Sequence, residues 1–289
     1  MYDDILLPID RSEEIDAVVD HAISIADRMD ATLHVLFVAD TTRDSVTTVR
    51  GEFVDALVRK GESIVETVGE RVDAANVSHT RVVIQGNPAQ TIVEYADKHG
   101  CDLLVVPTRG REGVSRYVLG SVAEKLVRLS PVPVLTTRLR ADERLTFPYE
   151  RILVATDGSA AADRAVEHAV DLADATEAAL YVLSIVEDSS LGDESESSVS
   201  VAESESRAQQ AVDGAIEAAA TAGVEAFERI EHGDPVAEIR RHVDEDAIDL
   251  VVLGTTGRHG IEQILLGSVA QRTVRTAPVP VVTVSADSS

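Results

Sequence analysis

Cysteine, tryptophan and lysine are nearly missing from this chain of 289 residues, which has one Cys, no Trp and three Lys. The single cysteine, Cys101, excludes an internal disulfide and any cysteine-based metal cluster. No apolar run reaches the roughly 18 residues that a membrane-spanning helix needs. The first residues are acidic, without the basic segment that opens a signal peptide. We therefore expect a soluble cytoplasmic protein.

Positive charge is also scarce: the chain has 51 acidic and 26 basic residues, which gives a formal net charge of −25. A field of this sign repels nucleic acids and anionic membranes, so we expect neither as a partner. The acidic, lysine-poor composition resembles that of proteins from salt-loving cytoplasms, where a Debye length of about 3 Å screens self-repulsion. An anionic ligand would need local donors, a basic side chain or a bound cation.

The chain contains an internal repeat. Residues 86–137 align with 233–284 without a gap at a constant offset of 147, and 23 of the 52 pairs are identical. A period this long indicates a duplicated domain, since solenoid repeats run at roughly 20–50 residues. The boundary falls in the polar stretch 140–150, and we predict domains at 1–140 and 150–289 joined by a linker at 141–149.

Strand and helix patterns alternate within each half. This order predicts two tandem doubly wound, Rossmann-like α/β domains, each with a five-stranded parallel sheet covered by helices on both faces. Ligands of such sheets bind at the carboxyl ends of the strands, where the winding direction reverses. In the first half we expect strands at 5–9, 32–38, 80–84, 103–106 and 132–136 and helices at 13–29, 53–72, 89–99 and 121–129.

One segment of the second half departs from the pattern. Residues 187–206 contain seven acidic residues, eight serines and no basic residue. Low hydrophobicity with charge of one sign predicts a mobile loop or a frayed helix start. A regulatory or docking role is the alternative, although no residue in the segment specifies one.

The most informative motif is the glycine-rich stretch from Gly254 to Ser268, which lies between a predicted strand and a predicted helix. Such a loop presents backbone N–H groups and the positive end of the helix dipole to an anion, and Arg258 adds a cation. It is not a Walker loop, since the second half has no lysine, and a dinucleotide fingerprint would follow the first strand. A phosphate cradle and a turn that only permits close packing both remain open.

Asp10 and Asp157 each end the first strand of their half. Because that strand should neighbour the fourth one at the reversal point, a carboxylate there is placed to accept hydrogen bonds from ribose hydroxyls. The alternative is that the aspartates and the serines that follow them, Ser12 and Ser159, cap the first helix.

Both halves resemble universal stress protein (UspA-type) domains, which belong with the adenine nucleotide alpha hydrolase-like folds, and the chain resembles a tandem member. Nucleotide-binding members of the family carry Gly-x2-Gly-x9-Gly-Ser/Thr, which the second half has in full. The resemblance implies binding of ATP, with Asp157 near the ribose and main-chain groups of Ile185 at the adenine. The expected site comprises Thr156, Asp157, Ile185, Gly254, Gly257, Arg258, Gly267, Ser268 and Val269.

The first half departs from the family motif at one position, where Pro107 replaces the first glycine. Proline lacks the N–H and adds a ring where the family brings backbone near the ribose. We therefore expect weaker nucleotide binding, or none, in the first half. Its matching positions are Asp10, Val38, Gly110, Gly120, Ser121 and Val122.

The sequence shows no catalytic constellation, because neither HExxH nor Gly-x-Ser-x-Gly occurs. The leading hypothesis is a stress-response or signalling module in which ATP or another adenylate, with Mg²⁺ held through its phosphates, biases domain association. A slow Mg-dependent ATPase and a non-binding association module are the alternatives. We expect no metal held by protein side chains alone, and we expect edge strands to pair within the chain or in a homodimer, with an unidentified protein partner.

Overall fold

The computed structural model describes residues 1–10, 15–40, 50–108, 119–138, 143–187, 194–256 and 266–286, without the side chains of 50–56 and 194–201. The chain divides into two compact units, Met1–Ala141 and Asp142–Ser289. Each unit contains one copy of the sequence repeat, so the prediction of two tandem α/β domains is confirmed. Among the described residues, no helix is both long and apolar enough to cross a membrane.

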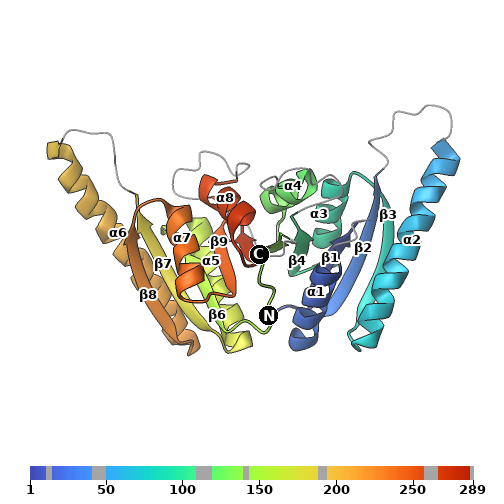
Figure 1. Cartoon of the computed structure of the whole chain (residues 1–289), viewed down its shortest axis with the longest axis horizontal. Helices are drawn as coiled ribbons and strands as arrows, with labels where there is room; N and C mark the ends of the chain where they lie inside the picture. Colours follow the sequence, from blue (N-terminus) through green and yellow to red (C-terminus); the bar gives the residue numbers. More distant parts are fainter. Residues whose placement is uncertain are drawn as a thin grey trace. The chain divides into compact units, whose positions relative to one another are not determined.

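The first unit alternates strands and helices along its whole length (Figure 1). Its strands are parallel and lie in the order β3-β2-β1-β4-β5. The elements are β1 (Asp4–Ile9), α1 (Asp16–Met29), β2 (Thr32–Asp40), α2 (Arg50–Ala74), β3 (His79–Gly86), α3 (Pro88–His99), β4 (Leu103–Pro107), α4 (Ser121–Leu129) and β5 (Val134–Thr137).

The second unit repeats this topology, with parallel strands in the order β8-β7-β6-β9-β10. In both units the winding reverses beside the first strand, so β1 lies between β2 and β4 and β6 lies between β7 and β9. The elements are β6 (Arg151–Ala155), α5 (Ala160–Thr176), β7 (Ala179–Val186), α6 (Glu194–Ala222), β8 (Ala226–His232), α7 (Pro235–Glu245), β9 (Leu250–Gly254), α8 (Ser268–Thr276) and β10 (Val281–Val284).

Helices cover both faces of each sheet, as right-handed crossovers require. On one face of the first sheet, Arg71 of α2 forms ion pairs with Asp16 and Asp20 of α1. On the other face α3 packs against α4, and α7 packs against α8 in the second unit. Strands covered on both faces are apolar throughout, and Ile5, Leu6 and Leu7 of β1 are fully buried.

A repeated aspartate fixes the amino end of the central strand in each unit. Asp102 Oδ2 accepts hydrogen bonds from the N–H groups of Asp3 and Asp4 at 2.7 and 2.9 Å. Asp249 Oδ2 accepts from Glu150 and Arg151, both at 3.0 Å. The identity of these residues in the repeat therefore has a structural cause, because each carboxylate satisfies two backbone donors at the start of a strand.

Of the two alternatives for the acidic segment, a helix start is confirmed for residues 194–206, which form the first turns of α6, and a mobile loop is wrong for them. That helix continues into an alanine-rich part in which Val212, Ala215 and Ala219 are buried. Adding residues to a helix costs little once part of that helix is packed, so this serine- and glutamate-rich segment extends the helix despite its negative charge. Residues 188–193 lie outside the described part of the chain.

Cys101 is buried ahead of β4. Burial raises the pKa of its thiol to about 12, so the thiolate form is suppressed. The residues expected to form a linker include Arg144 and Thr146, which bind within the second unit: Arg144 N–H donates to Pro278 O at 2.8 Å, and Thr146 Oγ1 to Asp249 Oδ1 at 3.1 Å.

Candidate functional site

The turn that follows β6 is organised around Asp157. Its Oδ1 accepts a hydrogen bond from Ser159 N–H at 3.0 Å, while Thr156 Oγ1 accepts from Gly158 N–H at 3.2 Å. Gly158 has φ +70°, a conformation that glycine adopts without a steric cost. Asp157 is partly exposed, so the turn orients its carboxylate at the carboxyl edge of the sheet.

Ser159 is the N-cap of α5, which confirms the capping interpretation for this serine. Its Oγ accepts from Ala162 N–H at 3.3 Å and donates to Thr256 O at 3.4 Å. One side chain thus joins the start of α5 to the loop that leaves β9. Ser12, the corresponding residue of the first unit, lies outside the described residues.

Gly254 has the close-packing role that the sequence left open beside a phosphate cradle. A Cβ built on it would lie 2.7 Å from the carbonyl carbon of Ala161 and 2.9 Å from Ala162 N. Real Cβ atoms do not approach backbone this closely, so only glycine allows β9 to end against the first turn of α5. The close-packing explanation therefore holds for Gly254, and it brings the ends of β6 and β9 together.

Pro107 occupies the corresponding position at the end of β4 and cannot permit this approach. The described part of α1 begins at Asp16, which corresponds to Asp163, whereas α5 begins at Ala160. Residues 11–14, which precede α1, lie outside the described part of the chain. Asp10 follows β1 and is partly exposed.

The helix that follows the glycine-rich loop begins without a side-chain cap. Gly267, its N-cap, donates its N–H to Thr255 O at 2.7 Å, and the first bond of α8 runs from Gln271 N–H to Gly267 O. The N–H groups of Ser268, Val269 and Ala270 precede that bond and have no intrahelical acceptor. Gly120 and Ser121 repeat this arrangement in α4, where Gly120 N–H donates to Thr108 O at 2.7 Å.

The ladder between β6 and β7 ends two residues before Ile185. Its last residue pair is Ala155 with Leu183, and Thr156 N–H donates a hydrogen bond to Leu183 O at 2.9 Å. Alternate residues of a parallel strand direct their main-chain groups to the same neighbour, so those of Ile185 face the β6 side beyond this ladder. Asp157 lies at the same level, two residues after Ala155. Val38 takes the matching place in β2, where it pairs with Ile84 of β3.

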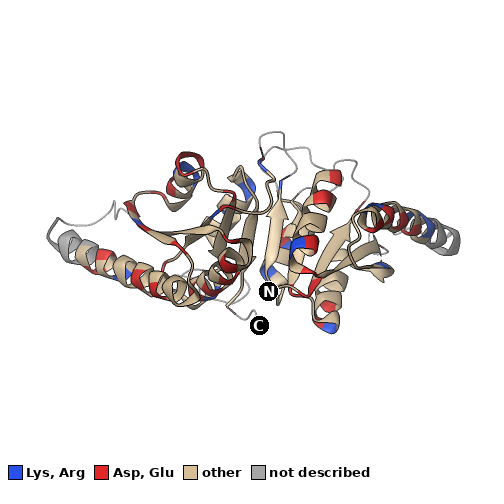
Figure 2. Ribbon diagram, turned by 90° about the horizontal axis from the view of Figure 1, so that it is seen from below, with Lys and Arg blue, Asp and Glu red and all other residues tan. Residues whose placement is uncertain are grey.

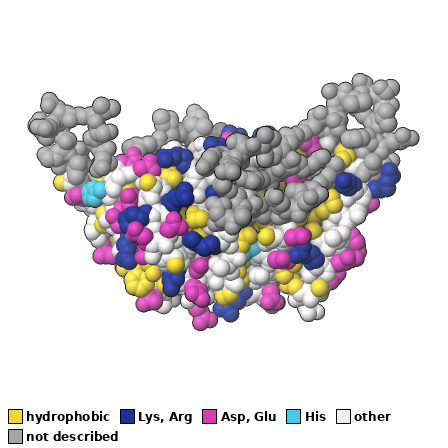
Figure 3. Space-filling model, in the orientation of Figure 1, with side chains coloured by type: hydrophobic (Ala, Val, Ile, Leu, Met, Phe, Trp, Pro, Cys, Tyr) yellow, Lys and Arg dark blue, Asp and Glu magenta, His cyan; other side chains and the backbone are white. Residues whose placement is uncertain are grey.

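Acidic residues lie along the helices of both units (Figure 2). On the face shown in Figure 3, Lys and Arg side chains lie among Asp and Glu side chains. Arg272 of α8 is paired in this way, with Nη1 2.9 Å from Asp234 Oδ2. Its hydrogen bond, together with one from Ala237 N–H, lowers the pKa of Asp234. The guanidinium of Arg272 is therefore already paired with the carboxylate of Asp234.

The structure brings together most of the residues expected at the second site, namely Thr156, Asp157, Ile185, Gly254, Gly267, Ser268 and Val269, at the carboxyl edge of one sheet. Gly257, Arg258 and Gly110 lie outside the described residues. A cluster around Glu231, Arg241 and His242 was not predicted from the sequence. The spacing of Glu238, Arg241 and Glu245 at i, i+3 and i+7 is the signal that indicates charge pairing along α7.

Comparison with known proteins assigns this arrangement to a family. The profile described as "Universal stress protein family" matches residues 1–138 and 148–285. Universal stress protein MJ0531 of Methanocaldococcus jannaschii is 33% identical over 141 residues, which cover 48% of this chain and 83% of that protein. Universal stress protein YxiE of Bacillus subtilis is 32% identical over 148 residues, covering 48% of this chain and 100% of YxiE.

A solved structure of similar length shares the fold. The crystal structure of a universal stress protein from Archaeoglobus fulgidus superimposes with a TM-score of 0.75 at 24% identity, covering 98% of each chain. The chain therefore belongs to the universal stress protein family and carries two tandem copies of its domain.

Proposed function

We propose that the second unit binds an adenine nucleotide, ATP in the first place, and that the bound nucleotide biases the association of the two domains in a stress response. The observation that carries this proposal is the convergence of an uncapped helix N-terminus, a partly exposed aspartate and the end of the β6–β7 ladder at one sheet edge. No other part of the described chain combines these three features with the family motif.

The N-terminus of α8 is the proposed phosphate subsite. Donors at the start of a helix, with the positive end of its dipole, bind anions, and the exposed Ser268 adds a hydroxyl. Gly254 and Gly267 keep side chains away from the backbone that borders this subsite. Arg258 belongs to the proposed set through the sequence motif alone.

Asp157 and Ile185 are proposed to hold the nucleoside. The carboxylate of Asp157, fixed by Ser159 N–H, accepts hydrogen bonds from ribose hydroxyls. The main-chain groups of Ile185, beyond the end of the ladder, offer one donor and one acceptor to the edge of adenine. In this proposal the aspartate binds the ribose and the helix start binds the phosphates, so the carboxylate does not contact the phosphates.

Magnesium is the proposed companion ion, because the phosphates of ATP add about four negative charges to a chain with a net charge of −25. Mg²⁺ binds chiefly through phosphate oxygens and water and asks for few carboxylates. The first unit, with Pro107, is proposed to bind nucleotide more weakly or not at all.

A charge placed at the helix start tests the proposal. Ser268→Asp should preserve or raise stability, since a carboxylate favours a helix N-terminus, yet it should repel the phosphates and abolish the thermal shift produced by Mg-ATP. Ligand at 100 times its Kd stabilises a protein by about 2.7 kcal/mol, which a melting curve resolves. Ser121→Asp makes the same change in the first unit and should leave that shift intact. Equal shifts in all three proteins would refute the phosphate subsite.

A further inference from the structure

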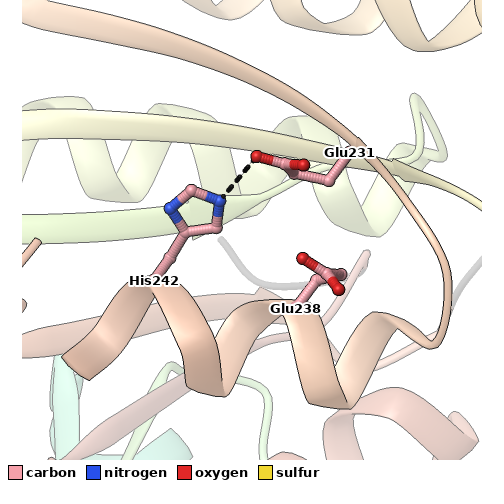
Figure 4. Close-up of side chains that lie close together, drawn as sticks. All are labelled: Glu231, Glu238 and His242. Carbon is pink, nitrogen blue, oxygen red and sulfur yellow. Dashed lines mark hydrogen bonds and ion pairs between the residues drawn. The ribbon is translucent and has the colours of Figure 1, made fainter. Parts of the chain in front are cut away.

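A second cluster of polar side chains lies on β8 and α7, and the nucleotide proposal does not use it. Glu231 projects from β8, and Glu238 and His242 project from successive turns of α7 toward it (Figure 4). One donor atom from each residue lies within 4.8 Å of the other two. His242 is buried and both glutamates are partly buried, so the donors converge in a partly buried place.

A positive centre already occupies the point of convergence. Nη2 of Arg241 lies 2.9 Å from Glu231 Oε1, 2.8 Å from Glu238 Oε2 and 3.1 Å from His242 Nε2. A single cationic nitrogen therefore contacts all three donors at once.

The imidazole of His242 is held in an orientation that suits a ligand. Its Nδ1 lies 2.7 Å from Asp246 Oδ2, so Nδ1–H donates to that carboxylate and the Nε2 lone pair faces the cluster. Metal-bound histidines commonly carry such a second carboxylate on the far nitrogen. Nε2 is also 3.1 Å from Glu231 Oε1, and two acceptors at that distance repel each other unless a cation or a proton lies between them.

We propose that Glu231, Glu238 and His242 form a binding site for a divalent transition metal, with Zn²⁺ as the best match, and that Arg241 occupies it in the metal-free protein. One imidazole nitrogen and two carboxylates leave a fourth position for water, a donor set typical of zinc, whereas Mg²⁺ and Ca²⁺ prefer oxygen alone. The donors need to close to about 2.0–2.2 Å from the ion.

Arg241 has a route out of the site. Its side chain is 37% exposed, and its Nη1 lies 2.7 Å from Oε2 of Glu245, which is 60% exposed. The guanidinium can therefore turn toward solvent and keep this ion pair while a metal takes its place. Metal and Arg241 compete, so removal of the arginine should tighten metal binding.

The site belongs to the second unit alone. At the repeat offset, the three donors correspond to Ile84, Thr91 and Tyr95, which do not form a ligand set. The duplication thus supplies an internal control within the same fold, and the proposal does not depend on nucleotide binding.

Titration of the full chain with Co²⁺ and Zn²⁺, after EDTA treatment, without nucleotide and at high KCl, tests the site. Co²⁺ should bind at one ion per chain and give the intense visible absorption of four-coordinate cobalt, and Zn²⁺ should displace it. His242→Tyr, which installs the residue of the first unit, and the milder Glu238→Gln should weaken binding by about tenfold or more.

Arg241→Gln is the deciding variant, because it should raise metal affinity, whereas a purely structural network would lose stability and gain no metal. Arg229→Gln is the matched control, since the guanidinium of Arg229 hydrogen-bonds Glu228 O at 2.8 Å and lies 4.0 Å from Asp246, and none of its described contacts is to the three donors. Its loss should leave metal affinity unchanged. Absorption that stays like that of aqueous Co²⁺, or affinity that Arg241→Gln does not raise, would overturn the proposal and leave a cluster neutralised by its own arginine.

Discussion

Gly254 shows how much one residue decides at the edge of the second sheet. The motif left open whether this glycine serves a phosphate or close packing, and the structure shows a packing contact, with the backbone of Ala161 only 2.7 Å from a built Cβ. No sequence spacing reveals that contact, because it joins residues that are far apart in the chain. The same glycine therefore fixes the packing of α5 and borders the proposed ligand.

Gly254→Ala should destabilise the protein by about 1–3 kcal/mol, because the added methyl group overlaps backbone that cannot move alone. Urea unfolding followed by circular dichroism measures the change. Gly214→Ala is the matched control: it lies in α6 with no atom within 4 Å of a built Cβ, and it should stabilise the helix by about 0.5–1 kcal/mol. Similar effects of the two changes would contradict the packing role.

The repeated histidines of the first helices, His21 and His168, predict an acid sensitivity. Burial lowers the pKa of each to about 4, from 6.5. The unfolded chain therefore binds more protons than the folded one between these values, and stability falls as the pH drops from about 6.5 to about 4. Each histidine contributes at most about 3 kcal/mol to this loss.

His21→Leu should flatten this part of the profile of unfolding free energy against pH, and the double variant with His168→Leu should flatten it further. His232→Leu, at a side chain that is 47% exposed, serves as the control for removal of a surface imidazole. A slope that persists in the double variant would assign the acid sensitivity to other groups.

At the scale of elements, the N-cap of α5 supports a further prediction. Ser159→Ala removes the acceptor of Ala162 N–H and the donor to Thr256 O, and should cost about 1 kcal/mol in unfolding free energy. Ser24→Ala is the control, since that hydroxyl donates to Asp20 O within α1, a bond that adds little. Equal costs would show that Ser159 is not an effective cap.

Local patterns in the sequence were sufficient to place most elements. The helix expected at 121–129 is α4 to the residue. The last strand of the first half was expected from Val132 but begins at Val134, since Pro133 has no N–H to donate to the ladder. The start of α6 stayed open between a loop and a helix, because its support comes from buried residues farther along the same helix.

The candidate site was predictable only in part, because some of its contacts join residues that are far apart in the chain. Asp157, Gly254, Gly267 and Ser268 are recognisable from local motifs and the repeat. The donors around Arg241 were missed, because Glu231 joins them only when β8 packs beside α7.

At the scale of the whole molecule, the charge of −25 predicts a dependence of stability on salt. The melting temperature should rise with KCl, chiefly as the Debye length shortens from about 30 Å at 0.01 M to about 3 Å at 1 M. Melting curves across this range measure the effect. A melting temperature that is flat below 1 M and rises only above it would reflect preferential exclusion of salt and contradict the screening account.

The account rests most directly on nucleotide binding by one of two similar units. Isothermal titration of the full chain with Mg-ATP, at the KCl concentration of greatest stability, measures both affinity and stoichiometry. We expect one tight site per chain that is lost in Ser268→Asp and kept in Ser121→Asp. No heat for any adenylate, or a tight site that survives Ser268→Asp and disappears in Ser121→Asp, would contradict the central claim.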